Sequence, residues 1–185
     1  PMYNFYYVNS YILDENNIKY LVDLISKKGI KYIHGYPSNI LNFLRLLRLH
    51  HRKTEVDFKG LLFSSEMLDD ITKEKIGKLS NAKYQPSYEQ SEMTILGSYG
   101  QDDYYYFYPT YGYDELVDED NLIIDKLNCP GKLIGTTFKN HLMPLIRYNT
   151  GDIAYKIKGN DPQLQHFKNM YSMTLAIKIR ININT

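Results

Sequence analysis

The fold class is decided by residues 31–47, which read KYIHGYPSNILNFLRLL. The first six residues have the composition of a buried strand, and Gly35 to Ser38 form a turn. Ser38 is then placed as the N-cap of a helix, whose expected buried face consists of Ile40, Leu41, Leu44 and Leu47. A strand that leads through a short turn into an amphipathic helix predicts a layered α/β fold.

The same alternation continues on both sides of this segment. A helix is predicted from an N-cap at Asp14 to Gly29, a strand over 59–63, and a third helix over 69–79. Helices that alternate with strands indicate a mainly parallel sheet. Residues 1–100 are therefore expected to form an α/β subdomain.

The pattern changes after residue 100 to short strands separated by Gly, Pro, Asp and Asn. Strands are expected at 104–108, 113–117, 122–124, 132–138 and 153–157. Residues 101–159 are thus predicted to form a small antiparallel, barrel-like β subdomain. Residues 160–185 fit neither pattern and stay unassigned, although 174–184 alternate like a strand without a visible partner.

Composition excludes several classes of protein. The 185 residues carry a net charge of +1, which gives no electrostatic reason to bind nucleic acid. No apolar run approaches the ~18 residues of a membrane helix. A single cysteine, Cys129, excludes an internal disulfide and a multi-cysteine zinc site, and it favours a reducing compartment, with the cytoplasm as the expected location.

Two polar clusters stand out as candidate sites, at residues 88–92 (YEQSE) and 147–152 (RYNTGD). Each is expected to be a loop where a predicted element changes type. A carboxylate at the C-terminal edge of a parallel sheet is where α/β folds bind ligands, and an aromatic ring beside it suits a base. Walker and dinucleotide glycine loops are absent, and the five histidines lack metal spacing.

Taken together, five segments in chain order resemble the adenylate-forming enzymes of the phenylacetate–coenzyme A ligase and CapK-like capsular polysaccharide biosynthesis type. The resemblance extends over about residues 10 to 158. Its segments are YIHGYPS at 32–38, SSEML at 64–68, YEQSE at 88–92, YPTYGY at 108–113 and MPLIRYNTGD at 143–152. Any one of them alone is weak evidence.

The resemblance implies a two-step ligase. A carboxylate attacks the α-phosphate of ATP to give an acyl-adenylate and pyrophosphate, and a thiol such as coenzyme A then takes the acyl group. Magnesium neutralises part of the phosphate charge in such a reaction. The implied ligands are therefore ATP, Mg and a small carboxylic acid, with a thiol such as coenzyme A as the acceptor.

The resemblance also implies roles for individual residues. Glu92 matches the glutamate that approaches the metal, and it is the one catalytic residue expected here. Tyr88 matches the aromatic that lies against adenine, and Ser91 would lie near the α-phosphate. Asp152 matches the aspartate that accepts hydrogen bonds from both ribose hydroxyls. Ser65 and Glu66 match the segment that borders the adenine.

The chain departs from the family pattern at three places. Glu89 stands where the family motif has glycine, and neither the family's phosphate loop nor its lysine-bearing C-terminal domain has a match in these residues. The expectation is a central fragment with negligible ligase turnover alone, which self-associates through the face that the missing parts would cover. The alternative is a degenerate, non-enzymatic remnant that serves as a binding or scaffold module.

Overall fold

The computed structural model describes residues 5–10, 13–50, 52, 56–158 and 176–180, and the chain divides into two compact units. Unit 1, residues 1–84, is an α/β layer, and unit 2, residues 85–185, is an antiparallel sheet. This confirms the predicted fold class. In the described part of the chain, no helix is long and apolar enough to cross a membrane.

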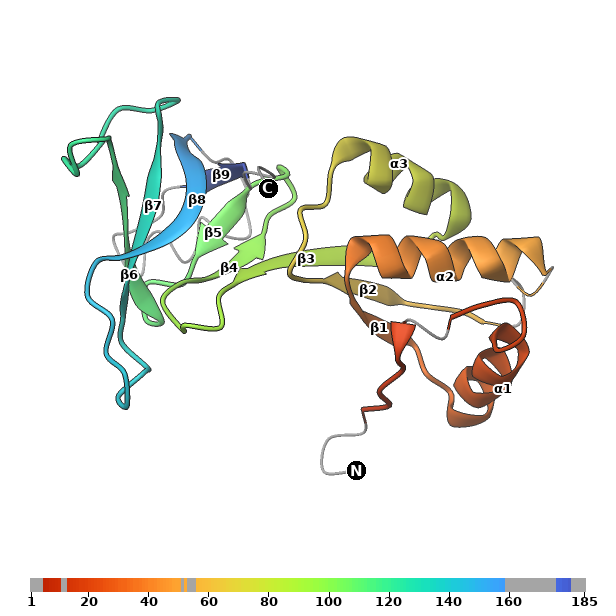
Figure 1. Cartoon of the computed structure of the whole chain (residues 1–185). Helices are drawn as coiled ribbons and strands as arrows, with labels where there is room; N and C mark the ends of the chain where they lie inside the picture. Colours follow the sequence, from red (N-terminus) through yellow and green to blue (C-terminus); the bar gives the residue numbers. More distant parts are fainter. Residues whose placement is uncertain (1–4, 11–12, 51, 53–55, 159–175, 181–185) are drawn as a thin grey trace. The chain divides into compact units, whose positions relative to one another are not determined.

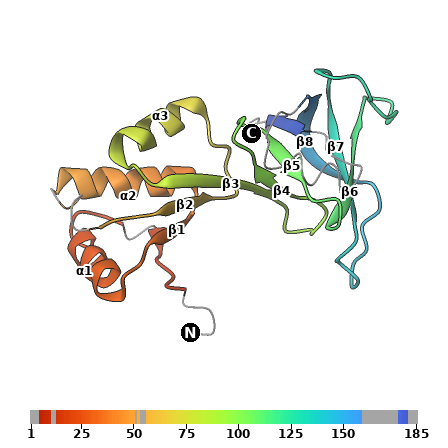
Figure 2. The same cartoon turned by 180° about the vertical axis from the view of Figure 1, so that it is seen from behind.

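Unit 1 contains a pair of parallel strands between helices. Its elements are α1 (Ile18–Lys28), β1 (Tyr32–Gly35), α2 (Pro37–Leu49), β2 (Gly60–Phe63) and α3 (Asp70–Leu79). Strand β1 pairs in parallel with β2. In both views α1 lies on one side of these strands, and α2 and α3 lie on the other (Figures 1 and 2). The parallel arrangement follows from the connecting helix α2.

The helices of unit 1 largely follow the sequence pattern. All four residues of the expected α2 face are buried, and α1 ends at Gly29, whose φ of 62° is the left-handed cap expected there. Asp69 caps α3 by accepting a hydrogen bond from the Thr72 amide at 2.7 Å. The predicted N-cap at Ser38 is wrong, because Tyr36 takes that place and Pro37 opens the helix. The N-cap predicted at Asp14 is also wrong, because Asn17 precedes α1.

Strand β1 is present, but it is not the buried strand that was predicted. Its residues alternate between exposed and half-buried, and Tyr32 is 62% exposed. The Tyr32 ring lies over Gly60 of β2, so that a Cβ at Gly60 would be 2.8 Å from Tyr32 Cδ1. The apolar composition of β1 therefore reflects contact across the strand pair rather than enclosure in the core.

The sheet of unit 2 is antiparallel throughout. Its strands are β3 (Lys83–Glu89), of which Gln85 onward belongs to this unit, β4 (Leu96–Tyr99), β5 (Tyr105–Phe107), β6 (Gly112–Val117), β7 (Pro130–Thr137), β8 (Tyr148–Ile157) and β9 (Ala176–Arg180). They follow the order β3-β4-β5-β9-β8-β7-β6, and the described strands do not close into a barrel. Strand β4 was not predicted, and the strand expected at 122–124 is only a single bridge from Ile123 to Val117.

Part of the unassigned tail completes this sheet. The alternating pattern at 174–184 predicted a strand without a partner, and β9 is that strand. Its backbone pairs with β5 on one side and with β8 on the other. The other residues of that segment lie outside the described part.

Candidate functional site

The two polar clusters meet within unit 2, although neither is the loop that was expected. Tyr88 belongs to β3, which runs antiparallel to β4, so the cluster does not sit at the edge of a parallel sheet. Residues 148–152 lie inside β8. The irregular parts are Gln90 to Ile95, which connect β3 to β4, and Arg147, which precedes β8.

A bulge in β8 orients Asp152. Leu133 of β7 faces three residues of β8, Thr150 to Asp152, and Gly151 adopts the left-handed φ of 82° that this insertion requires. The Thr150 hydroxyl donates to the Leu133 carbonyl at 2.9 Å and accepts from the Asp152 amide at 3.1 Å. Because the bulge needs a left-handed glycine, as many turns do, the sequence Asn-Thr-Gly-Asp has the composition of a turn. The chain nevertheless continues through it as a strand.

Two glycines let the connection between β3 and β4 lie directly on β6 and β7. A Cβ on Gly112 would be 1.8 Å from the Thr94 carbonyl oxygen, and a Cβ on Gly135 would be 2.7 Å from Thr94 Cβ. Thr94 is fully buried at this contact. Gly135 pairs with Tyr148 at the start of β8. This close approach therefore brings Glu92 to the strand that holds Asp152.

Tyr88 and Asp152 form the first link between the two clusters. The Tyr88 hydroxyl donates to Oδ2 of Asp152 at 2.5 Å and accepts from Nε2 of Gln90 at 3.0 Å. The ring packs against Phe107 and Tyr105, at centroid distances of 5.5 and 6.2 Å, and is 7% exposed. Burial and then the hydrogen bond to Asp152 raise the pKa of Tyr88. Tyr88 therefore reaches the site through its hydroxyl.

Tyr148 and Glu92 form the second link. The Tyr148 hydroxyl donates to Oε1 of Glu92 at 3.2 Å, and this bond raises the pKa of Tyr148. Asn140 donates to the backbone carbonyl of Glu92 at 3.5 Å. Each cluster thus supplies a tyrosine that binds the acidic side chain of the other. Tyr148 has no predicted role, because its place within a motif does not reveal its partner.

The remaining site predictions fall in different places. Ser91 is exposed in the turn beside Glu92. Ser65 and Glu66 belong to unit 1, where Ser65 has a φ of 64°. Both carboxylate oxygens of Glu66 accept from Ser38, at 3.1 Å from its amide and 2.9 Å from its hydroxyl. Glu66 therefore satisfies donors in the first turn of α2.

Arg147 has a structural partner. Its Nε donates to Oε2 of Glu115 at 3.1 Å, and a second guanidinium nitrogen donates to the Asn121 carbonyl at 3.3 Å. The carboxylate partner of Arg147 is therefore Glu115, and not Asp152 of the same motif.

Glu92 fits one ligand of a magnesium ion. In the described residues no donor lies on its second oxygen, Oε2, while Tyr148 holds Oε1. Mg²⁺ is commonly bound by one or two carboxylates together with substrate phosphates and water. The described residues contain no group of three His, Cys, Asp or Glu side chains that could hold a metal ion. Any magnesium would therefore depend on a phosphate ligand.

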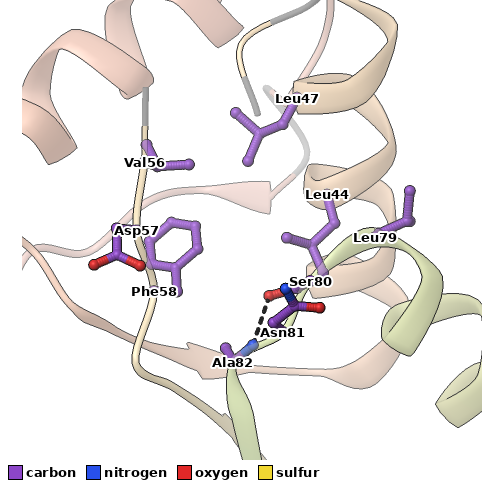
Figure 3. A pocket seen from close by; sticks show the side chains of 9 residues that line it. All are labelled: Leu44, Leu47, Val56, Asp57, Phe58, Leu79, Ser80, Asn81 and Ala82. Atoms are coloured by element: carbon purple, nitrogen blue, oxygen red, sulfur yellow. Dashed lines mark hydrogen bonds between the residues drawn. The ribbon is translucent and has the colours of Figure 1, made fainter. Parts of the chain in front are cut away.

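A cavity of about 210 Å³ lies elsewhere, within unit 1 (Figure 3). Leu44 and Leu47 of α2 face Val56 and Phe58 across it, and Ser80 accepts a hydrogen bond from the Ala82 amide at its rim. None of the predicted site residues lines this cavity.

Among the comparisons with known proteins, the one with solved structures finds matches. No protein-family model and no curated protein matches it. A crystal structure of 2-hydroxyisobutyryl-CoA ligase, in an open conformation with 2-HIB-AMP and CoA, matches 88% of this chain with a TM-score of 0.70 and 18% identity. The anthranilate CoA ligase AuaEII, in complex with anthranoyl-AMP, matches 78% with a TM-score of 0.56 and 12% identity. CmiS6 matches 89% with a TM-score of 0.56 and 13% identity.

These matches cover only part of each relative. The chain spans 37% of the 2-hydroxyisobutyryl-CoA ligase chain, 31% of AuaEII and 44% of CmiS6. At this level of identity the similarity is one of fold. The chain accordingly has the fold of a part of the acyl-CoA ligases.

Proposed function

We propose that unit 2 carries part of the nucleotide site of an adenylate-forming acid–thiol ligase. The observation that carries the proposal is the crossed pairing of Tyr88 with Asp152 and of Tyr148 with Glu92. It gathers, in one unit, the two carboxylates that the sequence resemblance assigns to ribose and to metal. The fold shared with ligases crystallised with acyl-adenylates supports the same class of function.

The proposed reaction has two balanced steps. A carboxylate oxygen attacks the α-phosphorus of ATP, which releases pyrophosphate and leaves an acyl-adenylate. The thiol of coenzyme A then attacks the acyl carbon, which forms a thioester and releases AMP. The five-segment resemblance favours a small carboxylic acid as substrate and the phenylacetate–coenzyme A ligase and CapK-like branch of these enzymes. The chain would contribute the central part of such a ligase.

Each acidic residue has a distinct proposed task. Asp152 accepts hydrogen bonds from the ribose hydroxyls, and the described residues place no donor on its Oδ1. Glu92 provides an oxygen for magnesium, which would neutralise phosphate charge when bound. Ser91 is exposed beside Glu92 and is proposed to lie near the α-phosphate. Tyr88 is the fourth proposed nucleotide-site residue, and its hydroxyl donates to Asp152.

Calorimetric titration of the full chain tests the proposal, with AMP and Mg-ATP as probes. Asp152→Asn should weaken AMP binding about 10- to 100-fold, since it removes the charge from a hydrogen-bonded acceptor. Glu92→Gln should weaken Mg-ATP binding while leaving metal-free AMP binding unchanged. Asp120→Asn is the matched control, because Asp120 is an exposed carboxylate of unit 2 whose side chain is distant in sequence from both motifs.

Two outcomes would contradict the proposal. One is a wild-type chain that binds neither AMP nor Mg-ATP, which would favour the non-enzymatic remnant. The other is equal affinity in the wild type, Asp152→Asn and Asp120→Asn, which would place any binding elsewhere.

A further inference from the structure

Four side chains of unit 2 form a continuous chain of hydrogen bonds that ends at Asp152. The Thr94 hydroxyl donates to Oε1 of Gln90. Nε2 of Gln90 donates to the Tyr88 hydroxyl at 3.0 Å, and Tyr88 donates to Oδ2 of Asp152 at 2.5 Å. Neither Gln90 nor Thr94 has a role in the function proposed above.

Each step of this chain fixes the direction of the next. A threonine hydroxyl has one proton, and Thr94 directs it to the amide oxygen of Gln90, so the amide nitrogen faces Tyr88. The phenol oxygen of Tyr88 then accepts from Gln90 and has its single proton left for Asp152. With the amide of Gln90 reversed, Tyr88 would instead donate to Gln90, and Asp152 would lose its donor.

Burial makes this direction persistent. Thr94 is fully buried beneath the contact with Gly112 and Gly135, and Tyr88 is 7% exposed. Hydrogen bonds in such an environment are stronger than in water, and unpaired groups there are costly. Asp152, at the other end of the chain, is only half-buried. The network therefore runs from the core of unit 2 to a carboxylate that a ligand can reach.

We propose that Gln90 and Thr94 are positioning residues for the ribose-binding carboxylate Asp152. They hold the Tyr88 proton on Oδ2, and so Oδ1 is presented in one orientation as the acceptor for ribose hydroxyls. The inference rests on the proposed nucleotide function. It predicts that these two residues set the preference for AMP over 2′-deoxy-AMP, because a fixed acceptor loses a partner when the hydroxyl is missing.

Four substitutions in the 185-residue protein test the direction of this chain of hydrogen bonds. Thr94→Val removes the donor with little change in shape, whereas Thr94→Ser keeps it. Gln90→Glu replaces the donor that faces Tyr88 with an acceptor, and Gln90→Met removes both groups. Thr94→Val, Gln90→Glu and Gln90→Met should each lower the ratio of the 2′-deoxy-AMP and AMP dissociation constants about 3- to 10-fold. Thr94→Ser should retain the wild-type ratio.

A second readout needs no ligand. The Tyr88 hydroxyl proton, bonded to a carboxylate in a buried site, should give a slowly exchanging downfield NMR signal that Tyr88→Phe removes. Gln90→Glu should shift this signal, because the proton gains a competing acceptor, and Thr94→Ser should leave it in place. An unchanged signal in Gln90→Glu, or an unchanged nucleotide ratio in folded Thr94→Val, would overturn the inference. A wild-type chain that binds no AMP would instead overturn the proposed function, and with it the ribose assignment, even if the NMR signal behaves as expected.

Discussion

Tyr148 donates a hydrogen bond to Oε1 of Glu92 over 3.2 Å, from the same strand that holds Asp152. Tyr88 makes the converse bond to Asp152 from the segment that holds Glu92. Each acidic side chain is thus oriented by a tyrosine of the other segment. A substitution in one segment is expected to affect the acid of the other.

Tyr148→Phe should weaken Mg-ATP binding about 3- to 10-fold, because Glu92 loses the donor that orients it. Binding of AMP without metal should stay unchanged, since the Tyr148 hydroxyl donates to Glu92, whereas Asp152 accepts from Tyr88. Titration calorimetry measures both. Tyr113→Phe, at an exposed position of β6, is the control. Equal loss of AMP and Mg-ATP affinity would contradict a specific role for Tyr148 at Glu92.

Alkaline pH should destabilise unit 2 through Tyr88. Because the folded state raises the pKa of this phenol above its ordinary value of 10.0, the folded protein holds the proton more tightly. The stabilisation is complete below pH 10 and declines above it, by up to about 1.4 kcal/mol per pH unit from this one group. Urea unfolding from about pH 8 to about pH 11, the range in which phenols titrate, should show a shallower decline of the free energy of unfolding in Tyr88→Phe. The same slope in both proteins would be evidence against this coupling.

Asp114→Asn should stabilise unit 2 at neutral pH. Burial raises the pKa of Asp114 from 3.8 to about 6, although its own backbone amide and Lys156 oppose the shift. The carboxyl is therefore favourable to folding below pH 3.8, and that stability is lost as the pH rises through about 6. In urea unfolding, Asp114→Asn should raise the free energy of unfolding by about 1–2 kcal/mol near pH 7.5, a figure already reduced for the partial exposure of the side chain. The gain should be small near pH 4. An equal gain at both values would mean that charge is not the cause.

Glu66→Ala and Ser38→Ala should each destabilise unit 1 by about 1 kcal/mol, since each removes a hydrogen bond in the first turn of α2. The double variant should cost about as much as either single one, because the pair acts as a unit. Far-ultraviolet circular dichroism follows the helices of unit 1 during urea unfolding. Additive losses would contradict the pairing. A parallel loss of AMP affinity would support the nucleotide role that the resemblance predicts for Glu66.

Glu89→Gly should strengthen Mg-ATP binding more than AMP binding, because it removes a negative charge beside the residues proposed to face the triphosphate. Glu89 is exposed in β3, so the substitution costs mainly strand stability, about 0.5–1 kcal/mol. Glu89→Gln separates the charge from the backbone effect. Failure of wild type and both variants to bind Mg-ATP would favour the remnant over a damaged nucleotide site.

The fold was predictable from the sequence where the spacing of residues within one element sets its buried face or its end. The buried stripe of α2 and the glycine cap of α1 follow from local spacing. The exposure of Tyr32 did not, since it depends on the neighbouring strand. The bulge at Gly151 was read as a loop, because a left-handed glycine occurs in both.

The candidate site shows the same limit. The polar clusters that contain Glu92 and Asp152 were visible in the sequence, but the roles of these two acids came only from the resemblance. Periodicity gave no sign of the hydrogen bonds that the two tyrosines make to them. Thr94 lies under Gly112 and Gly135, which follow it in the chain by about 18 and about 41 residues. Contacts at that separation are set by the packing of the sheet and leave no local pattern at Thr94.

The position of β9 between β5 and β8 has a consequence for synthesis. The ribosome synthesises the chain from its N-terminus, so β5 and β8 are made before the strand that pairs with them. Their hydrogen-bonding edges stay unpaired until β9 emerges. Until Ala176–Arg180 arrives, these edges can pair with other chains, as unprotected strand edges do. Premature termination before Ala176 should therefore yield a product that aggregates, rather than a smaller functional unit.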